Sequence, residues 1–153
     1  MTMQALNENE LTLFVDSVRT YFRVTTKQEP QITSAYLGMR DVQGFEFNGL
    51  VNFSGSYCGH ILVSMPAPLL RELLLMQHET DLNDGNLLDA AGEVANTLAG
   101  NARQTIGPDL QISVPVKLQG IAGLRARVRE RPYVITLNWN HQPALVFIDM
   151  EKH

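Results

Sequence analysis

The stretch that decides the fold reads LLDAAGEVANTLAGNARQTIG and runs from Leu87 to Gly107. Its apolar residues recur at spacings of three and four, which is the period of an amphipathic α-helix. At roughly 100° per residue they gather on one side, which is expected to pack against a sheet. These residues are Leu87, Ala91, Val94, Ala95, Leu98 and Ala102. We therefore predict a long helix from Leu87 to Ile106 that stops at Gly107-Pro108.

The opposite side of this helix carries a narrow polar stripe within an arc of roughly 80°. Its members are Asp89, Glu93, Asn96, Gly100 and Arg103. Solvated helix faces are normally charged, so the acidic residues alone fit an ordinary exposed surface. A glycine in a helix interior, however, costs roughly 1 kcal/mol relative to alanine. The presence of both Gly92 and Gly100 indicates that one of them lets another surface come close.

The rest of the chain predicts two further helices and a sheet. The helices are expected from Glu8 to about Val24 and from Pro66 through Leu74. The segments with strand character are 32–40, 45–54, 57–65, 112–118, 133–138 and 144–150. The gaps at 41–44 and 55–56 are short and favour antiparallel hairpins. The polar stretch 77–86 is expected to be a loop, and segment 120–131 is not assigned to a helix or a strand.

This order of elements predicts an α+β fold with two layers, in which helices cover a mostly antiparallel sheet. The chain has 153 residues, of which 44% are hydrophobic and 18% charged. These values fit a single domain over residues 1–153 with one sizeable core. The formal net charge of -4 gives no support for binding to nucleic acid or to an acidic membrane.

The expected location is cytoplasmic. Cys58 is the single cysteine, so no intrachain disulfide can form, and a reducing compartment is the simpler interpretation. The N-terminal residues MTMQALNENELTLFV lack the basic and apolar regions of a signal peptide. The longest apolar stretches, such as 73–76, are far too short to cross a bilayer.

The pattern Asp89-x-x-x-Glu93-x-x-Asn96 resembles the signature of the CheC, CheX and FliY phosphatases of bacterial chemotaxis. Two neighbouring segments strengthen this resemblance. The run 99–102 (AGNA) is similar to the CheX helix, and 112–116 (ISVPV) is similar to the Ser-x-Pro strand of the family, although the CheC pattern places its proline somewhat further downstream. The order of elements matches over roughly residues 8–150. The chain has one Glu-x-x-Asn, as in CheX, which is described as a homodimer with one site per subunit.

This resemblance implies hydrolysis of the aspartyl phosphate on a CheY-like receiver domain. A side-chain amide can accept from and donate to one water while remaining neutral, so Asn96 is the candidate for orienting the attacking water. Glu93 lies one turn earlier on the same face and would pair with the lysine beside the phosphorylated aspartate. Asp89, Gly100 and Arg103 are candidate partner-binding residues. The Mg²⁺ would belong to the receiver, and we expect no cofactor or metal in this chain.

Other interpretations of the stripe remain open. A module of the same fold could dock a receiver or a flagellar-switch partner without hydrolysing anything, and a structural dimer could leave this helix face merely solvated. Asn101, towards the flank, could serve either in capping or in packing. The alternating Arg125, Arg127, Arg129 and Arg131 fit a charged edge strand or, less well, a basic docking face.

Two other patterns fit metal sites poorly. Cys58-x-His60 lacks a second pair of ligands with suitable spacing, so a zinc site is not expected. The run 81–85 (DLNDG) departs from a calcium loop, because its glycine comes one position early and Gly92 occupies the twelfth position. A loop whose side chains cap the following helix fits the run better.

Overall fold

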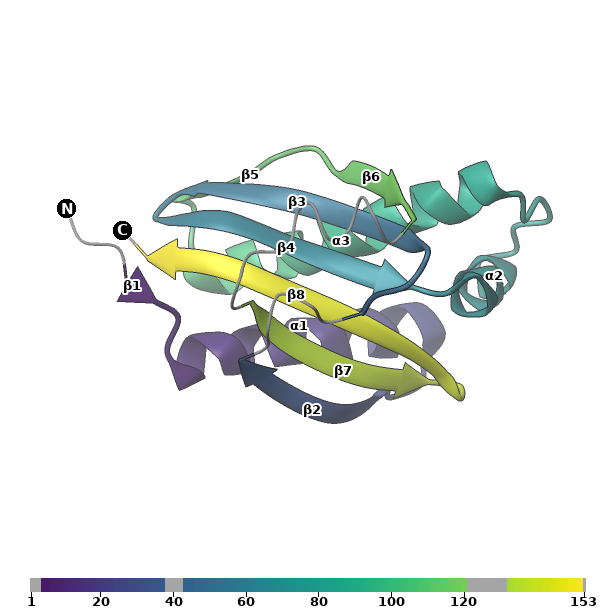
Figure 1. The fold of residues 1–153 in the computed structure, drawn as a ribbon, viewed down its shortest axis with the longest axis horizontal. Coiled ribbons are helices and arrows are strands. Elements are labelled where there is room, and N and C mark those ends of the chain that lie inside the picture. The colour runs from purple at the N-terminus through teal and green to yellow at the C-terminus, as the bar shows by residue number, and fades with distance from the viewer. Residues whose placement is uncertain (1–3, 38–42, 121–131, 153) are drawn as a thin grey trace.

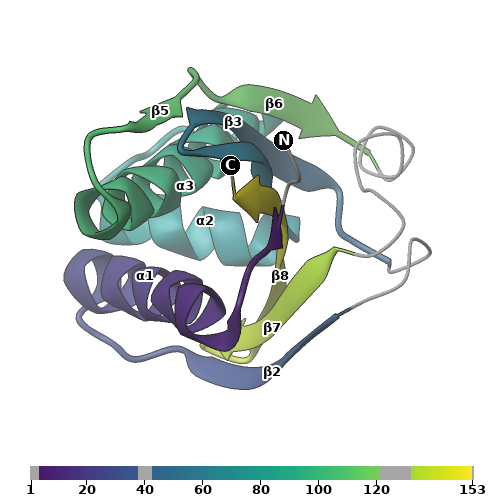
Figure 2. The same cartoon turned by 90° about the vertical axis from the view of Figure 1, so that its left-hand side faces the viewer.

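The computed structural model describes residues 4–37, 43–120 and 132–152. Three helices in these ranges cover one face of an antiparallel sheet (Figures 1 and 2). They are α1 (Glu8–Thr26), α2 (Ala67–Met76) and α3 (Asp84–Ile106). The predicted fold class, a two-layer α+β arrangement with a long helix against an antiparallel sheet, is confirmed.

The sheet contains eight strands in the described ranges. They are β1 (Gln4–Ala5), β2 (Gln31–Leu37), β3 (Phe47–Gly55), β4 (Tyr57–Met65), β5 (Leu110–Ile112), β6 (Val116–Gln119), β7 (Tyr133–Trp139) and β8 (Gln142–Lys152). Their order is β2-β7-β8-β4-β3-β5, while β1 pairs with β8 and β6 pairs with β3. The long strand β8 runs through the middle of the sheet, where it pairs with both β4 and β7 (Figure 1).

Alternation along the strands gives the sheet two different faces. On the helix side, side chains of β3, β4, β7 and β8 join those of the helices in the main core. Phe22 of α1 lies against Trp139 of β7 there, with ring centroids 5.8 Å apart. On the other face, a smaller buried cluster contains Leu50, Leu62, Val134, Leu145 and Phe147. The helix layer is therefore held by the larger of the two apolar clusters.

The N-terminal end of α1 is closed by a capping box. The side chain of Asn7 accepts from the amide of Glu10 at 2.9 Å, and the Glu10 carboxylate accepts from the amide of Asn7 at 3.0 Å. The same carboxylate accepts a hydrogen bond from the hydroxyl of Tyr57 on β4. One side chain thus begins the helix and links it to the sheet.

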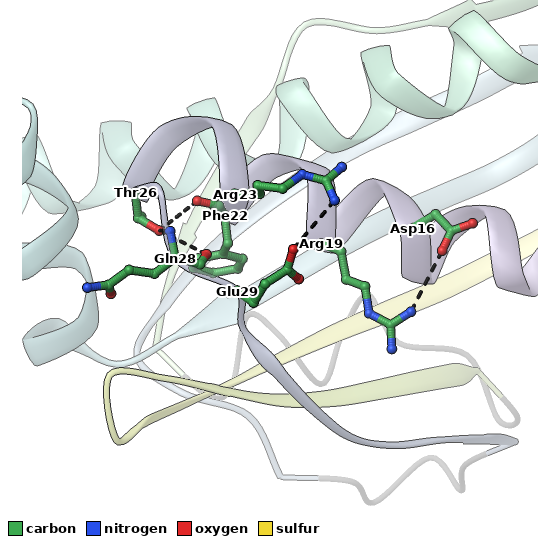
Figure 3. Close-up of polar contacts among 7 residues, drawn as sticks. All are labelled: Asp16, Arg19, Phe22, Arg23, Thr26, Gln28 and Glu29. Atoms are coloured by element: carbon green, nitrogen blue, oxygen red, sulfur yellow. Dashed lines mark hydrogen bonds and ion pairs between the residues drawn. The ribbon is translucent and has the colours of Figure 1, made fainter.

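The C-terminal end of α1 turns sharply into β2 (Figure 3). Lys27 adopts the left-handed conformation (φ 61°) that commonly ends a helix. The buried hydroxyl of Thr26 donates to the carbonyl oxygen of Phe22 at 2.6 Å. Arg23 and Glu29 form an exposed ion pair at 3.4 Å across the turn. These local contacts direct the chain from the helix layer to the edge of the sheet.

A glycine on β3 brings α3 close to the sheet. A Cβ atom at Gly49 would overlap the carbonyl oxygen of Ala91 and lie 2.9 Å from the Cα of Gly92. The two backbones can therefore approach only because position 49 has no side chain. This contact sets the depth at which α3 sits and directs its opposite face to solvent.

The structure corrects three predictions about local elements. The hairpin expected across 41–44 does not form, since β2 pairs with β7 at the edge of the sheet, whereas the hairpin across 55–56 is confirmed. The strand predicted over 112–118 is divided into β5 and β6. Residues 113–115 face only two residues of β3, and Pro115 has no N–H to donate, so the pairing with β3 is interrupted there. Helix α3 begins at Asp84, inside the predicted loop 77–86.

The remaining element predictions agree with the structure, with ends that differ by a few residues. Helices α1 and α2 and strands β3, β4, β7 and β8 all lie on their predicted segments. The short strand β1 was not expected. Parts of the predicted strand 32–40, the turn 41–44 and segment 120–131, with its four alternating arginines, lie outside the described residues.

Candidate functional site

Helix α3 begins with a polar cap. The side chain of Asn83 accepts from the amide of Asn86 at 2.8 Å, and the amide of Asn83 donates to the carboxylate of Asp81 at 3.2 Å. Asp84 in the first turn and Arg103 in the last both complement the helix dipole. The run 81–85 therefore leads into the helix as expected, and the cap explains why α3 begins three residues early.

The five residues of the predicted stripe lie on the solvent side of α3. Asp89, Glu93, Asn96 and Arg103 are exposed, and Gly100 is half-buried. The apolar side, which includes Leu87, Val94 and Leu98, is buried against the sheet and the other helices. The sequence period thus predicted correctly which side chains of α3 a partner could reach.

The two ends of the stripe are held by contacts with neighbouring strands. The Nζ of Lys117 on β6 lies 2.6 Å from the carboxylate of Asp89. The Nε of Arg103 donates to the carbonyl oxygen of Leu110 on β5 at 2.8 Å. Both residues consequently have structural contacts besides any role in docking.

The middle of the stripe is different. Within the described ranges, the side chains of Glu93 and Asn96 form no hydrogen bond or ion pair with another residue, and only the carbonyl oxygen of Glu93 is used, by the hydroxyl of Thr97 at 2.9 Å. Residues three apart in a helix are neighbours on its surface, with a rise of about 4.5 Å between them. A carboxylate and an amide therefore stand side by side and free to engage a partner.

An acidic hollow of about 320 Å³ lies beside Glu93, between α3 and the ends of α1 and α2. Its lining includes the carboxylates of Glu79, Asp89 and Glu93, and no lysine or arginine contributes to it. Tyr21 of α1 forms part of its floor. Burial raises the pKa of Tyr21 to about 12, and the nearby Glu93 carboxylate acts in the same direction. The phenol therefore stays neutral at physiological pH.

A second hollow, of about 580 Å³, lies beside the C-terminal half of α3, where Gly107 and Pro108 after the helix and Ile112 at the end of β5 also line it. Asn96, Gly100 and Arg103 line it, together with Asn101 and Gln104. The lining contains several amides and one cation but no carboxylate. Asn96 thus stands at the edge of a surface whose charge differs from that beside Glu93.

The two glycines of α3 have different surroundings. Gly92 is buried, and a Cβ atom there would lie 3.1 Å from Cγ of Lys117. The Cβ of Pro115 would lie 3.5 Å away, and the Cα of Gly92 is next to the Ala91 carbonyl in the contact with Gly49, so packing within the chain accounts for Gly92. A Cβ atom at Gly100 would meet nothing within 4 Å. We expected one of the two glycines to let another surface approach the helix. Gly92 does so within the chain, for the segment that contains Pro115 and Lys117, whereas Gly100 faces open space.

Sequence reasoning did not anticipate several contributors to this surface. Lys117, the carbonyl of Leu110, Tyr21 and Glu79 reach the stripe only through the tertiary fold, and no local pattern marks them. Over the part of the chain that the structure describes, no three side chains of His, Cys, Asp or Glu gather to hold a metal ion. None of the helices in those ranges is long and apolar enough to span a bilayer.

The two-layer fold, with its long helix against an antiparallel sheet, matches the fold of a class of chemotaxis proteins. The family model described as chemotaxis phosphatase CheX matches residues 47–138, and the chain belongs to this family. The resemblance inferred from the sequence is thus confirmed. No curated protein matches the chain significantly.

Solved structures place the fold in the same group. A CheC-like superfamily protein from Shewanella sp. PV-4 is 16% identical with a TM-score of 0.78, over 97% of this chain and 99% of that one. The chemotaxis protein CheX from Vibrio vulnificus is 19% identical with a TM-score of 0.76, over 93% and 99%. A chain of the CheX–CheY–BeF3–Mg²⁺ complex from Borrelia burgdorferi is 17% identical with a TM-score of 0.72, over 94% and 96%. At these identities the likeness establishes the fold.

Proposed function

We propose that this chain hydrolyses the aspartyl phosphate of a CheY-like response regulator, with Glu93 and Asn96 as its catalytic residues. The observation that carries the proposal is the pair of unpartnered side chains at the centre of an otherwise anchored helix face. Membership of the chemotaxis phosphatase CheX family supports the same reaction. A CheX of the same fold has been solved in complex with CheY and the phosphoryl analogue BeF3, which supports a receiver domain as partner.

Asn96 would orient the water that attacks phosphorus. The water oxygen bonds to phosphorus while the bond between phosphorus and the aspartate oxygen breaks, which releases inorganic phosphate and a carboxylate. Such a reaction depends on positioning and charge neutralisation and needs little covalent chemistry from the protein. An amide can both donate to and accept from the water, and it adds no charge beside an anionic phosphoryl group.

Glu93 would fix the register of the complex. Its carboxylate is exposed and adjacent to Asn96, so it can meet a cationic side chain beside the phosphorylated aspartate. A role as general base is less favourable, because a second anion close to a phosphoryl group repels it. Glu93 therefore acts by pairing with the receiver's lysine and so brings Asn96 to the phosphoryl group.

Asp89 and Arg103 would make docking contacts at the two ends of the stripe. Each is exposed although it is already engaged within the chain, Asp89 with Lys117 and Arg103 with the Leu110 carbonyl. These contacts hold the two side chains in defined positions before the partner arrives. Preorganised contacts reduce the entropy lost on binding.

The chain would need no cofactor of its own, since the Mg²⁺ that neutralises the phosphoryl group would belong to the receiver. We also propose that the protein works as a cytoplasmic homodimer with one Glu93–Asn96 pair in each subunit, as the single Glu-x-x-Asn motif and the family imply. Light scattering of the purified protein measures this directly. A mass near that of one 17.1 kDa chain at micromolar concentration would contradict the dimer.

The decisive experiment measures phosphate loss from phosphorylated receiver domains with the wild-type protein and with Asn96→Ala. The wild type is expected to accelerate hydrolysis, and Asn96→Ala to lose about 100-fold or more of this acceleration, the range seen when one oriented polar group is removed. Affinity for a BeF3-treated receiver should change little. The matched control is Asn9→Ala, which removes an exposed amide from α1 and should retain full activity.

Two results would overturn the assignment. If Asn96→Ala hydrolyses as fast as the wild type, the water-orienting role is wrong. If the wild type binds phosphorylated receivers but accelerates hydrolysis of none, the chain is a docking module of the same fold and not a phosphatase.

A further inference from the structure

Gly100 is a helix-interior glycine that the fold itself does not need. Its backbone is ordinary helix, since the glycines with positive φ in the described ranges are at positions 55, 59, 107 and 120. A Cβ atom at position 100 would have no neighbour within 4 Å outside the adjacent helix backbone. Neither backbone conformation nor packing within the chain therefore explains its presence, in contrast to Gly49 and Gly92.

The missing side chain leaves the floor of the second hollow open next to Asn96. Gly100 lies four residues beyond Asn96, on the same face and about 6 Å further along the helix axis. Both residues line the hollow. A side chain at this position would project from the helix toward any molecule that approaches Asn96 from solvent.

The lining of the hollow favours a main-chain segment with an acidic side chain. The amides of Asn96, Asn101 and Gln104 both donate and accept, as a peptide backbone requires. Arg103 is the one cation in the lining, and its Nε is held by the carbonyl of Leu110, so its remaining N–H groups are left for another acceptor. The phosphorylated face of a receiver is anionic and matches this hollow better than the acidic one beside Glu93.

We propose that the hollow over Gly100 receives a loop of the phosphorylated receiver domain, and that the absence of a side chain there sets how closely the phosphorylated aspartate approaches Asn96. This inference rests on the proposed function and adds to it the surface that determines access. A misplacement of about 1 Å can cost about 100-fold in rate. A side chain of several atoms at position 100 is therefore incompatible with efficient hydrolysis.

The test compares Gly100→Ala and Gly100→Gln with the wild type in three assays, which measure thermal unfolding, affinity for a BeF3-treated receiver and hydrolysis of the phosphorylated receiver. Both variants replace glycine with better helix formers in open space, so both should fold, with a melting temperature raised by about 2–4 °C for alanine. Gly100→Gln should lower kcat/KM at least 10-fold and weaken binding by a similar factor. Gly100→Ala should have a smaller effect in the same direction.

The control is Thr105→Gln, which places the same side chain on an exposed position of α3 outside this hollow and should leave activity unchanged. Wild-type affinity and kcat/KM in Gly100→Gln would overturn the inference. A second outcome separates the two proposals. If the wild type hydrolyses no receiver, but Gly100→Gln binds the BeF3-treated receiver more weakly than the wild type does, the proposed phosphatase function is wrong and the docking surface is supported.

Discussion

At the residue scale, the Glu10 carboxylate links the helix layer to the sheet. It caps α1 through Asn7 and accepts from the hydroxyl of Tyr57. Burial alone would raise the pKa of Glu10, but the hydrogen bonds from Tyr57 and Asn7 and the charge of Lys152 outweigh it, so the pKa lies below the usual 4.5. For Tyr57, burial and the neighbouring Glu10 raise the pKa to about 12.

These two shifts predict the pH dependence of stability. A lowered carboxyl pKa stabilises the fold above pH 4.5, and this contribution is lost as the pH falls below that value. A raised phenol pKa stabilises the fold below pH 10, and this contribution is lost as the pH rises from 10 to about 12. Tyr57→Phe should therefore lower the free energy of unfolding by about 1.5–3 kcal/mol near pH 7, and the difference should shrink at both pH extremes.

Urea unfolding between pH 3 and pH 11 measures this difference. Tyr36→Phe is the matched control, because Tyr36 is 44% exposed on the edge strand β2 and its hydroxyl forms no hydrogen bond with the described residues. A difference between wild type and Tyr57→Phe that stays constant from pH 3 to pH 11 would show that the hydroxyl does not act through Glu10.

At the element scale, the contact between α3 and β3 determines where the site lies. Gly49→Ala would push a methyl group into the carbonyl oxygen of Ala91, and neither backbone can yield without shifting the helix. Overpacking of this kind typically costs about 1–3 kcal/mol, and more where the obstacle is backbone. We expect a clear fall in melting temperature, measured by circular dichroism.

At position 100 the same change from glycine to alanine should have the opposite effect on stability. Open space around position 100 means that the alanine gains helix propensity without a clash. The two variants should thus shift the melting temperature in opposite directions. If Gly49→Ala is as stable as the wild type, the close approach of α3 to β3 is not as tight as described.

Local signals were sufficient for the elements that carry the candidate site. The period of three and four residues in 87–106 predicted α3, and the exposed side of that period contains Glu93 and Asn96. Which strand pairs with β2 could not be predicted in this way. Its partner β7 lies about a hundred residues further along the chain, where Thr136 meets Ser34, and a short connecting segment suggested a hairpin with β3 instead.

The contacts around the stripe could not be predicted for the same reason. Lys117 reaches Asp89 only because β6 pairs with the end of β3 over which α3 packs. The break between β5 and β6 arises because three residues, 113–115, face two residues of β3. The pattern of apolar residues in the sequence does not reveal such an extra residue. The sequence alone also could not distinguish the packed Gly92 from the open Gly100, although both are helix-interior glycines.

At the scale of the whole molecule, one main core joins all three helices to the sheet. The single tryptophan, Trp139, is 2% exposed within it and lies against Phe22. If residues 1–153 form one domain, as we propose, Trp139 fluorescence and helical circular dichroism should report the same urea midpoint. Midpoints that differ beyond error would show that the helix layer and the sheet unfold separately.

The open position at Gly100 also determines how this protein would respond to artificial selection. A library screened only for heat resistance should be enriched in alanine and other helix formers at position 100, because nothing in the fold opposes them. Position 49 should remain glycine in the same screen. Comparing survivors of a heat screen with survivors of a signalling screen would therefore separate the glycine that the fold requires from the glycine that is kept for a partner.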